Sequence, residues 1–233
     1  MKNYTHLMIA LLLCSFCISC NNRVYNNRVF LSQNSIENKT IAIVPAEVIL
    51  SGKLPKGMSD KEKMLQEQSE SKFYQELLYS EFLDKSKSFE KDKYGVHFIN
   101  PQEVNSKLIK ADFYNNLKEK SSEEIANVVG TDMVFIVKIN KQRLLSDGAA
   151  IGIDIAENVL NSVLNPSGGN NNINSANRTH NISFDATLID GKTGTTVGKF
   201  SNLRQATWNA PPDRILRRNY ARITRQLSVF ALN

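Results

Sequence analysis

Hydrophobic positions along the chain follow two spacings, one typical of strands and the other typical of helices. Dense β-branched runs or strict alternation predict strands at 40–50, 94–100, 131–140, 179–190 and 195–200. Helical spacing follows the capping-box sequences at 59–62 and 121–124 and recurs over 102–110 and 211–227. The pattern therefore predicts a single α/β domain over 39–230, with helices packed in two or three layers on a mixed sheet of about five strands and a basic helix at its end.

The longest predicted helix begins after Ser59. Its segment 66–72 is wholly polar, so this part of the helix is expected to extend beyond the core. The apolar stripe expected to face the core comprises Met64, Leu65, Phe73, Leu77, Leu78 and Phe82. Pro45 marks the point where the first strand is expected to leave the sheet, and Gly130 suits the end of the helix that opens at 121–124.

Small apolar residues followed by an asparagine-rich stretch predict an insertion at about 147–178. Ile151, Ile155 and Val159 fall near helical spacing, which favours a helix that docks on the parent domain. The alternative is that residues 147–165 form a homo-oligomer contact or a membrane-contacting element. The length of the segment and its acidic residues exclude a membrane-spanning helix.

The first residues have the pattern of an export signal. The apolar run 7–18 is too short to span a bilayer but suits a secretory signal peptide over 1–19. The sequence Cys17-Ile18-Ser19-Cys20 resembles the bacterial lipobox, although Cys17 stands where leucine is usual. This resemblance implies that fatty acyl chains such as palmitate anchor the mature protein to a membrane through Cys20, while the alternative is a plain secretory signal.

The residues after Cys20 indicate where the mature protein is delivered and how the domain is connected to its lipid anchor. No aspartate follows Cys20, which resembles the signal for delivery to the outer membrane, so we expect an envelope lipoprotein that faces the periplasm. Residues 20–38 are rich in asparagine and serine and are predicted to be a flexible tether. An edge strand near 28–31 is the alternative.

The formal net charge of +6 is concentrated near the end of the chain. The final predicted helix carries Arg214, Arg217, Arg218, Arg222 and Arg225 beside its apolar stripe. Guanidinium groups pair well with oxyanions, so this face is a candidate contact for an anionic surface or a carboxylate-rich partner, the alternative being a solvated face. Trp208 is a candidate partner contact or a packing residue. Nucleic acid is not expected as a partner of an exported chain.

The residue types needed for catalysis are sparse. All three cysteines lie within the first twenty residues, and the histidines stand at 6, 97 and 180, so neither a thiolate site nor a histidine metal cluster is expected. The glycines and lysines of 191–200 do not form a phosphate-binding loop, because a strand rather than a helix follows. We therefore expect neither an enzyme nor a bound cofactor.

Three segments carry a resemblance to a known group of domains. They read IAIVPAEVIL, EEIANVVGTDMVFIVKI and ATLIDGKTGTTVGKF, in the order expected for 39–230. This pattern resembles the envelope α/β domain of the curli-secretion lipoprotein, the lipoprotein activators of penicillin-binding proteins and the N-terminal domain of the Tol β-propeller protein. The resemblance implies a non-catalytic envelope lipoprotein that acts as a protein-interaction or assembly module. The alternative is an oligomeric component of an outer-membrane secretion or assembly complex.

Overall fold

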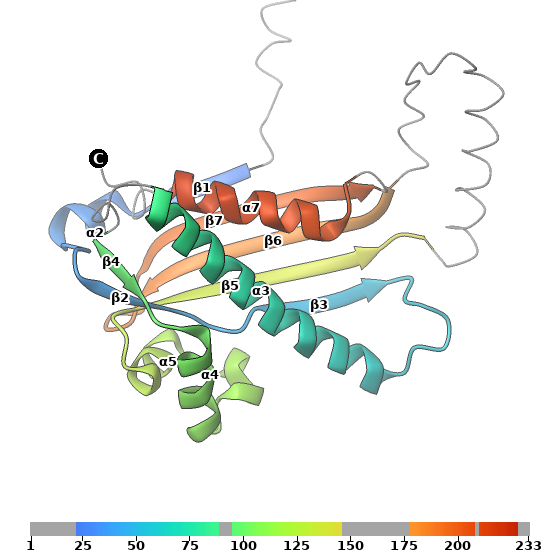
Figure 1. The fold of residues 1–233 in the computed structure, drawn as a ribbon, viewed down its shortest axis with the longest axis horizontal. Coiled ribbons are helices and arrows are strands. Elements are labelled where there is room, and N and C mark those ends of the chain that lie inside the picture. The colour runs from blue at the N-terminus through green and yellow to red at the C-terminus, as the bar shows by residue number, and fades with distance from the viewer. Residues whose placement is uncertain (1–21, 89–94, 146–177, 208–209, 228–233) are drawn as a thin grey trace, which may run out of the picture.

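A mixed sheet of seven strands organises the part of the chain that the computed structural model describes, which is residues 22–88, 95–145, 178–207 and 210–227 (Figure 1). The strands are β1 (Asn22–Asn26), β2 (Lys39–Ile43), β3 (Glu47–Gly52), β4 (Val96–Phe98), β5 (Met133–Arg143), β6 (Arg178–Asp190) and β7 (Thr196–Thr207). Their order is β1-β7-β6-β5-β2-β4, and β3 also pairs with β5. The predicted α/β class with helices on a mixed sheet is confirmed, although the sheet has two more strands than expected.

The central position of β5 follows from its three pairings. It runs parallel to β2 and β3 and antiparallel to β6. The strands predicted at 179–190 and 195–200 are confirmed, and they form a hairpin in which β6 and β7 pair antiparallel over most of their length. The alternation predicted for β6 is also confirmed, since Ile182, Phe184, Ala186 and Leu188 are fully buried.

The run 40–50, predicted to be one strand, forms two strands. Ile43 pairs with Phe135, and Glu47 pairs with Lys138, so residues 44–46 lie opposite only two residues of β5. This insertion of one residue is a bulge. Pro45 lies within the bulge and has no N–H to donate to a ladder, which explains why the pairing is interrupted there.

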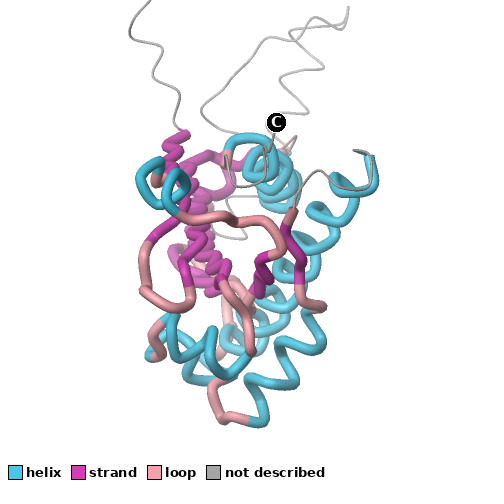
Figure 2. Tube along the Cα trace, turned by 90° about the vertical axis from the view of Figure 1, so that its left-hand side faces the viewer, coloured by secondary structure: helices cyan, strands magenta, loops and turns pink. Residues whose placement is uncertain are grey.

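Helices cover the two faces of the sheet unequally. Helices α3 (Asp60–Ser88) and α7 (Pro212–Gln226) pack on one face, where they complete the larger core. Helices α4 (Pro101–Lys110) and α5 (Ser122–Val129) pack on the other face and, with the 3₁₀ helix η1 (Tyr114–Glu119), form a smaller core against β2 and β5. Figure 2 shows helices on both sides of the strands. The domain therefore has three layers at β2 and β5, while β6 and β7 leave Asn181, Ser183 and Leu203 at least partly exposed.

The local helix signals are confirmed. Ser59 and Glu62 form a reciprocal capping box at the start of α3, and Ser121 and Glu124 do the same for α5. Gly130 ends α5 with a φ of 72°, a conformation that glycine adopts at low cost. Helix α4 begins and ends close to its predicted bounds.

The apolar stripe predicted for α3 is only half correct. Leu77, Leu78 and Phe82 are buried as expected, together with Tyr74. Met64, Leu65 and Phe73 are 48%, 52% and 44% exposed. The first half of α3 extends past the larger core, which leaves these apolar side chains without a covering element in the described structure.

The structure differs from the predicted tether over residues 22–38. Strand β1 pairs antiparallel with β7, from Asn22 opposite Asn202 to Asn26 opposite Gly198. Asn27 then caps α2 (Arg28–Gln33), which occupies the segment proposed as an alternative edge strand. Phe30 and Leu31 of α2 pack against the larger core, so the few apolar residues of this polar segment are sufficient to attach it.

Candidate functional site

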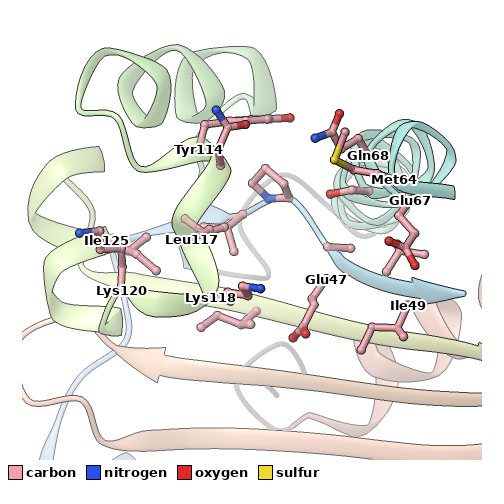
Figure 3. A pocket seen from close by; sticks show the side chains of 17 residues that line it. Glu47, Ile49, Met64, Glu67, Gln68, Tyr114, Leu117, Lys118, Lys120 and Ile125 are labelled. Atoms are coloured by element: carbon pink, nitrogen blue, oxygen red, sulfur yellow. The ribbon is translucent and has the colours of Figure 1, made fainter. Parts of the chain in front are cut away.

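A groove between α3 and η1 is the site that we consider first. Its volume is about 560 Å³ (Figure 3). Pro45, Ile49, Ile125 and Ile136 contribute apolar surface from the bulge, β3, α5 and β5. The walls come from Met64 and Gln68 of α3 and from Tyr114 and Leu117 of η1.

The groove exists because two features of the sequence coincide. The bulge at 44–46 separates β2 from β3 where α3 crosses the sheet. The polar first half of α3 is not drawn into the core, so the space between α3 and η1 stays open. The buried amide of Gln75 stabilises this arrangement, because its Nε2 donates to the Ile43 carbonyl at 2.7 Å and its Oε1 accepts from Asn105 at 2.9 Å.

The outer edge of β3 lies along this groove and is partly covered by α3. The N–H of Ala46 donates to the Ser71 carbonyl at 3.4 Å, and the N–H of Leu50 donates to the Glu67 carboxylate at 2.8 Å. The alternation of a strand directs the Val48 N–H to the same side as that of Leu50. No hydrogen bond from Val48 to α3 is found among the described residues. Val48 lines the groove with its backbone, because its side chain is buried in the larger core.

The rim of the groove carries both signs of charge. On one side, Glu47 pairs with Lys138 at 3.0 Å and Glu67 lies 3.7 Å from Lys63. On the other side, Lys120 Nζ lies 4.6 Å from the centre of the Phe113 ring. Burial raises the pKa of Tyr114, which stays a neutral hydroxyl near pH 7.

This combination of apolar surface and exposed strand edge suits an extended peptide. A peptide strand beside β3 would pair with the Val48 backbone, would take the place of the Glu67 carboxylate at Leu50, and would place alternate side chains in the groove. The Glu67 carboxylate currently protects the Leu50 N–H, as charged side chains often do at strand edges. Histidine and cysteine are absent from the described residues that line the groove.

The arginines predicted as a contact lie elsewhere. Arg214, Arg217, Arg218 and Arg225 are exposed on α7, and Arg222 is half-buried there. The core residues of α7 are buried as predicted. Figure 1 shows α7 at the upper edge of the molecule, whereas η1 and α5 follow α4 at the lower end. The structure therefore does not bring the arginine face and the groove together.

A group of titratable side chains joins α3, β5, β6 and α7. Lys141 pairs with Glu70 at 2.8 Å, and both side chains are largely buried. The Tyr74 hydroxyl donates to Asp213 at 3.0 Å, and burial, followed by the charges of Glu70 and Asp213, raises the Tyr74 pKa. Burial, followed by the charges of Lys141 and Arg143, lowers the His180 pKa. Because most of these groups are paired with one another, they tie the elements of this end of the sheet together.

Several predicted features lie outside the described residues. They are the signal peptide 1–19, the lipid-attachment residue Cys20, Trp208 and nearly all of the insertion at 147–178, including the predicted contact 147–165. Within the described ranges, none of the helices combines the length and apolarity that a membrane span requires. The same ranges contain no group of three or more His, Cys, Asp or Glu side chains placed to hold a metal ion.

Sequence reasoning missed the groove because its residues come from five separate elements. The signals that pointed to it were indirect: Pro45 within a strand pattern and the polar segment 66–72 within a helix pattern. Neither signal shows that α3 and η1 flank the edge of β3.

Comparison with known proteins gives distant matches only. No protein-family model and no curated protein matches the sequence. Among solved structures, a PelC dodecamer from Paraburkholderia phytofirmans has 8% identity and a TM-score of 0.42, with 91% of this chain and 98% of that chain covered. Lipoprotein GNA1162 from Neisseria meningitidis has 10% identity and a TM-score of 0.39, with 81% and 96% covered. The hypothetical protein CT253 from Chlamydia trachomatis has 11% identity and a TM-score of 0.32, with 84% and 100% covered.

These neighbours include a bacterial lipoprotein, but a likeness at TM-scores below 0.5 is too loose to transfer function. None of the three comes from the curli-secretion, penicillin-binding-protein activator or Tol groups that the sequence resembles. The finer resemblance therefore stays an expectation.

Proposed function

We propose that this protein is a non-catalytic lipoprotein of the bacterial envelope, anchored through Cys20, and that it binds an extended segment of a partner protein in the groove between α3 and η1. The observation that carries the proposal is the Val48 N–H on the outer edge of β3, which makes no hydrogen bond to α3 among the described residues and lies beside an apolar surface. A strand edge in such a groove supplies the backbone pairing that peptide recognition by strand addition requires.

The lipobox-like sequence supports the location. Acyl chains on Cys20 would hold the domain at a membrane, where the partner would be another envelope protein. The absence of recognisable catalytic motifs from the sequence supports binding rather than catalysis.

Site-specific photocrosslinking in intact cells tests the proposal. We expect a photoreactive residue at Ile49, in the groove, to form one reproducible adduct with a protein. Gln68→Trp places a bulky side chain in the groove and should reduce this adduct at least tenfold, because affinity depends on space for the partner strand. Glu76→Trp is the matched control, since Glu76 is an exposed residue of the same helix.

A second control places the photoreactive residue at Ile109 of α4, which is 60% exposed and does not line the groove. The same adduct from Ile49 and Ile109, or an Ile49 adduct that Gln68→Trp does not change, would show that the groove does not bind the partner.

A further inference from the structure

The start of β1 lies very close in sequence to the proposed lipid anchor. Strand β1 begins at Asn22, two residues after Cys20, and two residues of extended chain span roughly 7 Å. If Cys20 carries acyl chains, as proposed above, the start of β1 must therefore lie near the bilayer surface. The tether predicted from sequence would have allowed the domain to stand away from the membrane.

Helix α7 lies along the same edge of the molecule as β1. Figure 1 places both elements at the upper edge. The Asn26 side chain at the end of β1 donates to the Gln226 carbonyl of α7 at 3.3 Å, which joins the two elements directly. A membrane that approaches the start of β1 is therefore also close to α7.

The exposed side of α7 is strongly basic. The helix contains five arginines and a single acid, Asp213, whose carboxylate accepts a hydrogen bond from Tyr74. No ion pair involves Arg217, Arg218 or Arg225 among the described residues. The apolar side of α7 is already buried in the larger core, so the exposed side offers charge rather than a hydrophobic surface.

Exposed apolar side chains of β1 and α2 contribute to the same edge of the molecule. Val24 and Tyr25 of β1 are 40% and 50% exposed, and Val29 of α2 is 66% exposed. Tyrosine is enriched where proteins meet the headgroup layer, because its ring is apolar and its hydroxyl is polar. Cross-strand partners share a face, so Val24 lies on the side of the core residue Phe200 and of α7. The exposed side chains of Arg23 and Tyr25 project from the other face of β1 at the same edge.

We propose that the edge formed by β1 and the arginine face of α7 docks on the anionic headgroups of the membrane that carries the lipid anchor. Guanidinium groups form bidentate pairs with phosphate oxygens, and basic residues near a bilayer are attracted by its negative surface potential. Docking orients the domain, whereas the acyl chains by themselves only keep it at the membrane.

Fluorescence of the reconstituted lipoprotein tests this orientation. Removal of the signal peptide leaves Cys20 as the only native cysteine, and acylation blocks its thiol, so an introduced cysteine is a unique labelling site. A dye attached to the cysteine of Gln226→Cys reports on α7. A dye attached to the cysteine of Ile109→Cys reports on α4, at the other end of the molecule. The quencher is a spin-labelled headgroup in vesicles of phosphatidylethanolamine and phosphatidylglycerol, compared with vesicles of phosphatidylcholine.

We expect strong quenching at position 226 and weak quenching at position 109 in the anionic vesicles. The difference should shrink in phosphatidylcholine vesicles or in 0.5 M NaCl, because salt screens exposed charges. The combined change Arg217→Gln, Arg218→Gln and Arg225→Gln should lower the ratio of docked to undocked protein by roughly fivefold per arginine, or about 100-fold. The control Lys53→Gln, Lys61→Gln and Lys110→Gln removes the same charge elsewhere and should have little effect.

Flotation of the vesicles separates this proposal from the one on which it rests. Protein that fails to float with either vesicle type would contradict the lipid anchor. Protein that floats but shows equal quenching at the two positions, or quenching that the arginine variant does not reduce, would overturn membrane docking while leaving the anchor intact.

Discussion

His180 is the residue whose surroundings make the clearest prediction about pH. It lies near the start of β6, and its Nδ1 is buried without a hydrogen-bond partner among the described residues. Burial lowers its pKa in the folded protein, the positive charges of Lys141 and Arg143 lower it further, and the charge of Glu70 opposes them. The unfolded chain therefore binds a proton at this histidine at a higher pH than the folded protein does.

The free energy of unfolding should consequently fall as the pH decreases through about 6.5, the ordinary histidine pKa. We expect His180→Gln to lose less stability between pH 7.5 and pH 5.5 than the original protein, as measured by urea unfolding at the two values. His97→Gln is the control, because His97 is exposed on β4. An unchanged pH dependence in His180→Gln would contradict this role.

For single residues, the sequence predicts contacts between residues close together in the chain better than contacts between residues far apart in the chain. The capping pair of Ser121 and Glu124 is three residues apart, so its pattern is visible in the sequence. The Gln75 amide meets the Ile43 carbonyl 32 residues away, and nothing in the intervening sequence indicates it. Gly191 directly follows β6, and the sequence does not show that a side chain there would collide with Ala126 and the Asp132 carbonyl.

At the scale of elements, β1 shows how a polar segment becomes structured. Residues 22–26 have too few apolar side chains to predict a strand, yet they pair with β7, whose sequence lies more than 170 residues away. The edge of β7 supplies the backbone partners, and this information is absent from the segment itself. Helix α3 shows the opposite case, because its apolar pattern continues through Met64 and Leu65 beyond the core that could bury them.

Two proline substitutions distinguish a paired β1 from a tether. Successive residues of an edge strand direct their N–H groups alternately toward the sheet and toward solvent. One of Val24→Pro and Tyr25→Pro should therefore remove a hydrogen bond to β7 and destabilise the protein by about 1–3 kcal/mol, while the other should have a smaller effect. Thermal unfolding of the two variants measures this difference, and equal melting temperatures for both variants and the original protein would indicate a tether.

At the scale of the whole molecule, the two proposed surfaces lie at different ends of the sheet. Helix α7, which carries the arginines, lies with β1 at the upper edge in Figure 1, whereas α4 and the η1 that follows it lie at the lower end. The groove lies between α3 and η1. A domain docked through α7 would therefore keep the groove in the aqueous compartment, accessible to a partner. The two surfaces share no residues, so changes at one should add to changes at the other without coupling.

This arrangement predicts that changes at the two surfaces have separate effects in the two assays. Arg217→Gln with Arg218→Gln and Arg225→Gln should abolish quenching of the α7 label but retain most of the photocrosslink from Ile49, whereas Gln68→Trp should remove the crosslink and leave the quenching intact. Quenching is measured in the reconstituted vesicles, and the crosslink is measured in intact cells that produce the same variants. If the arginine variant also removed the crosslink, with normal flotation and an unchanged melting temperature, orientation by the membrane would be a condition for partner binding. The two surfaces would then act in sequence rather than independently.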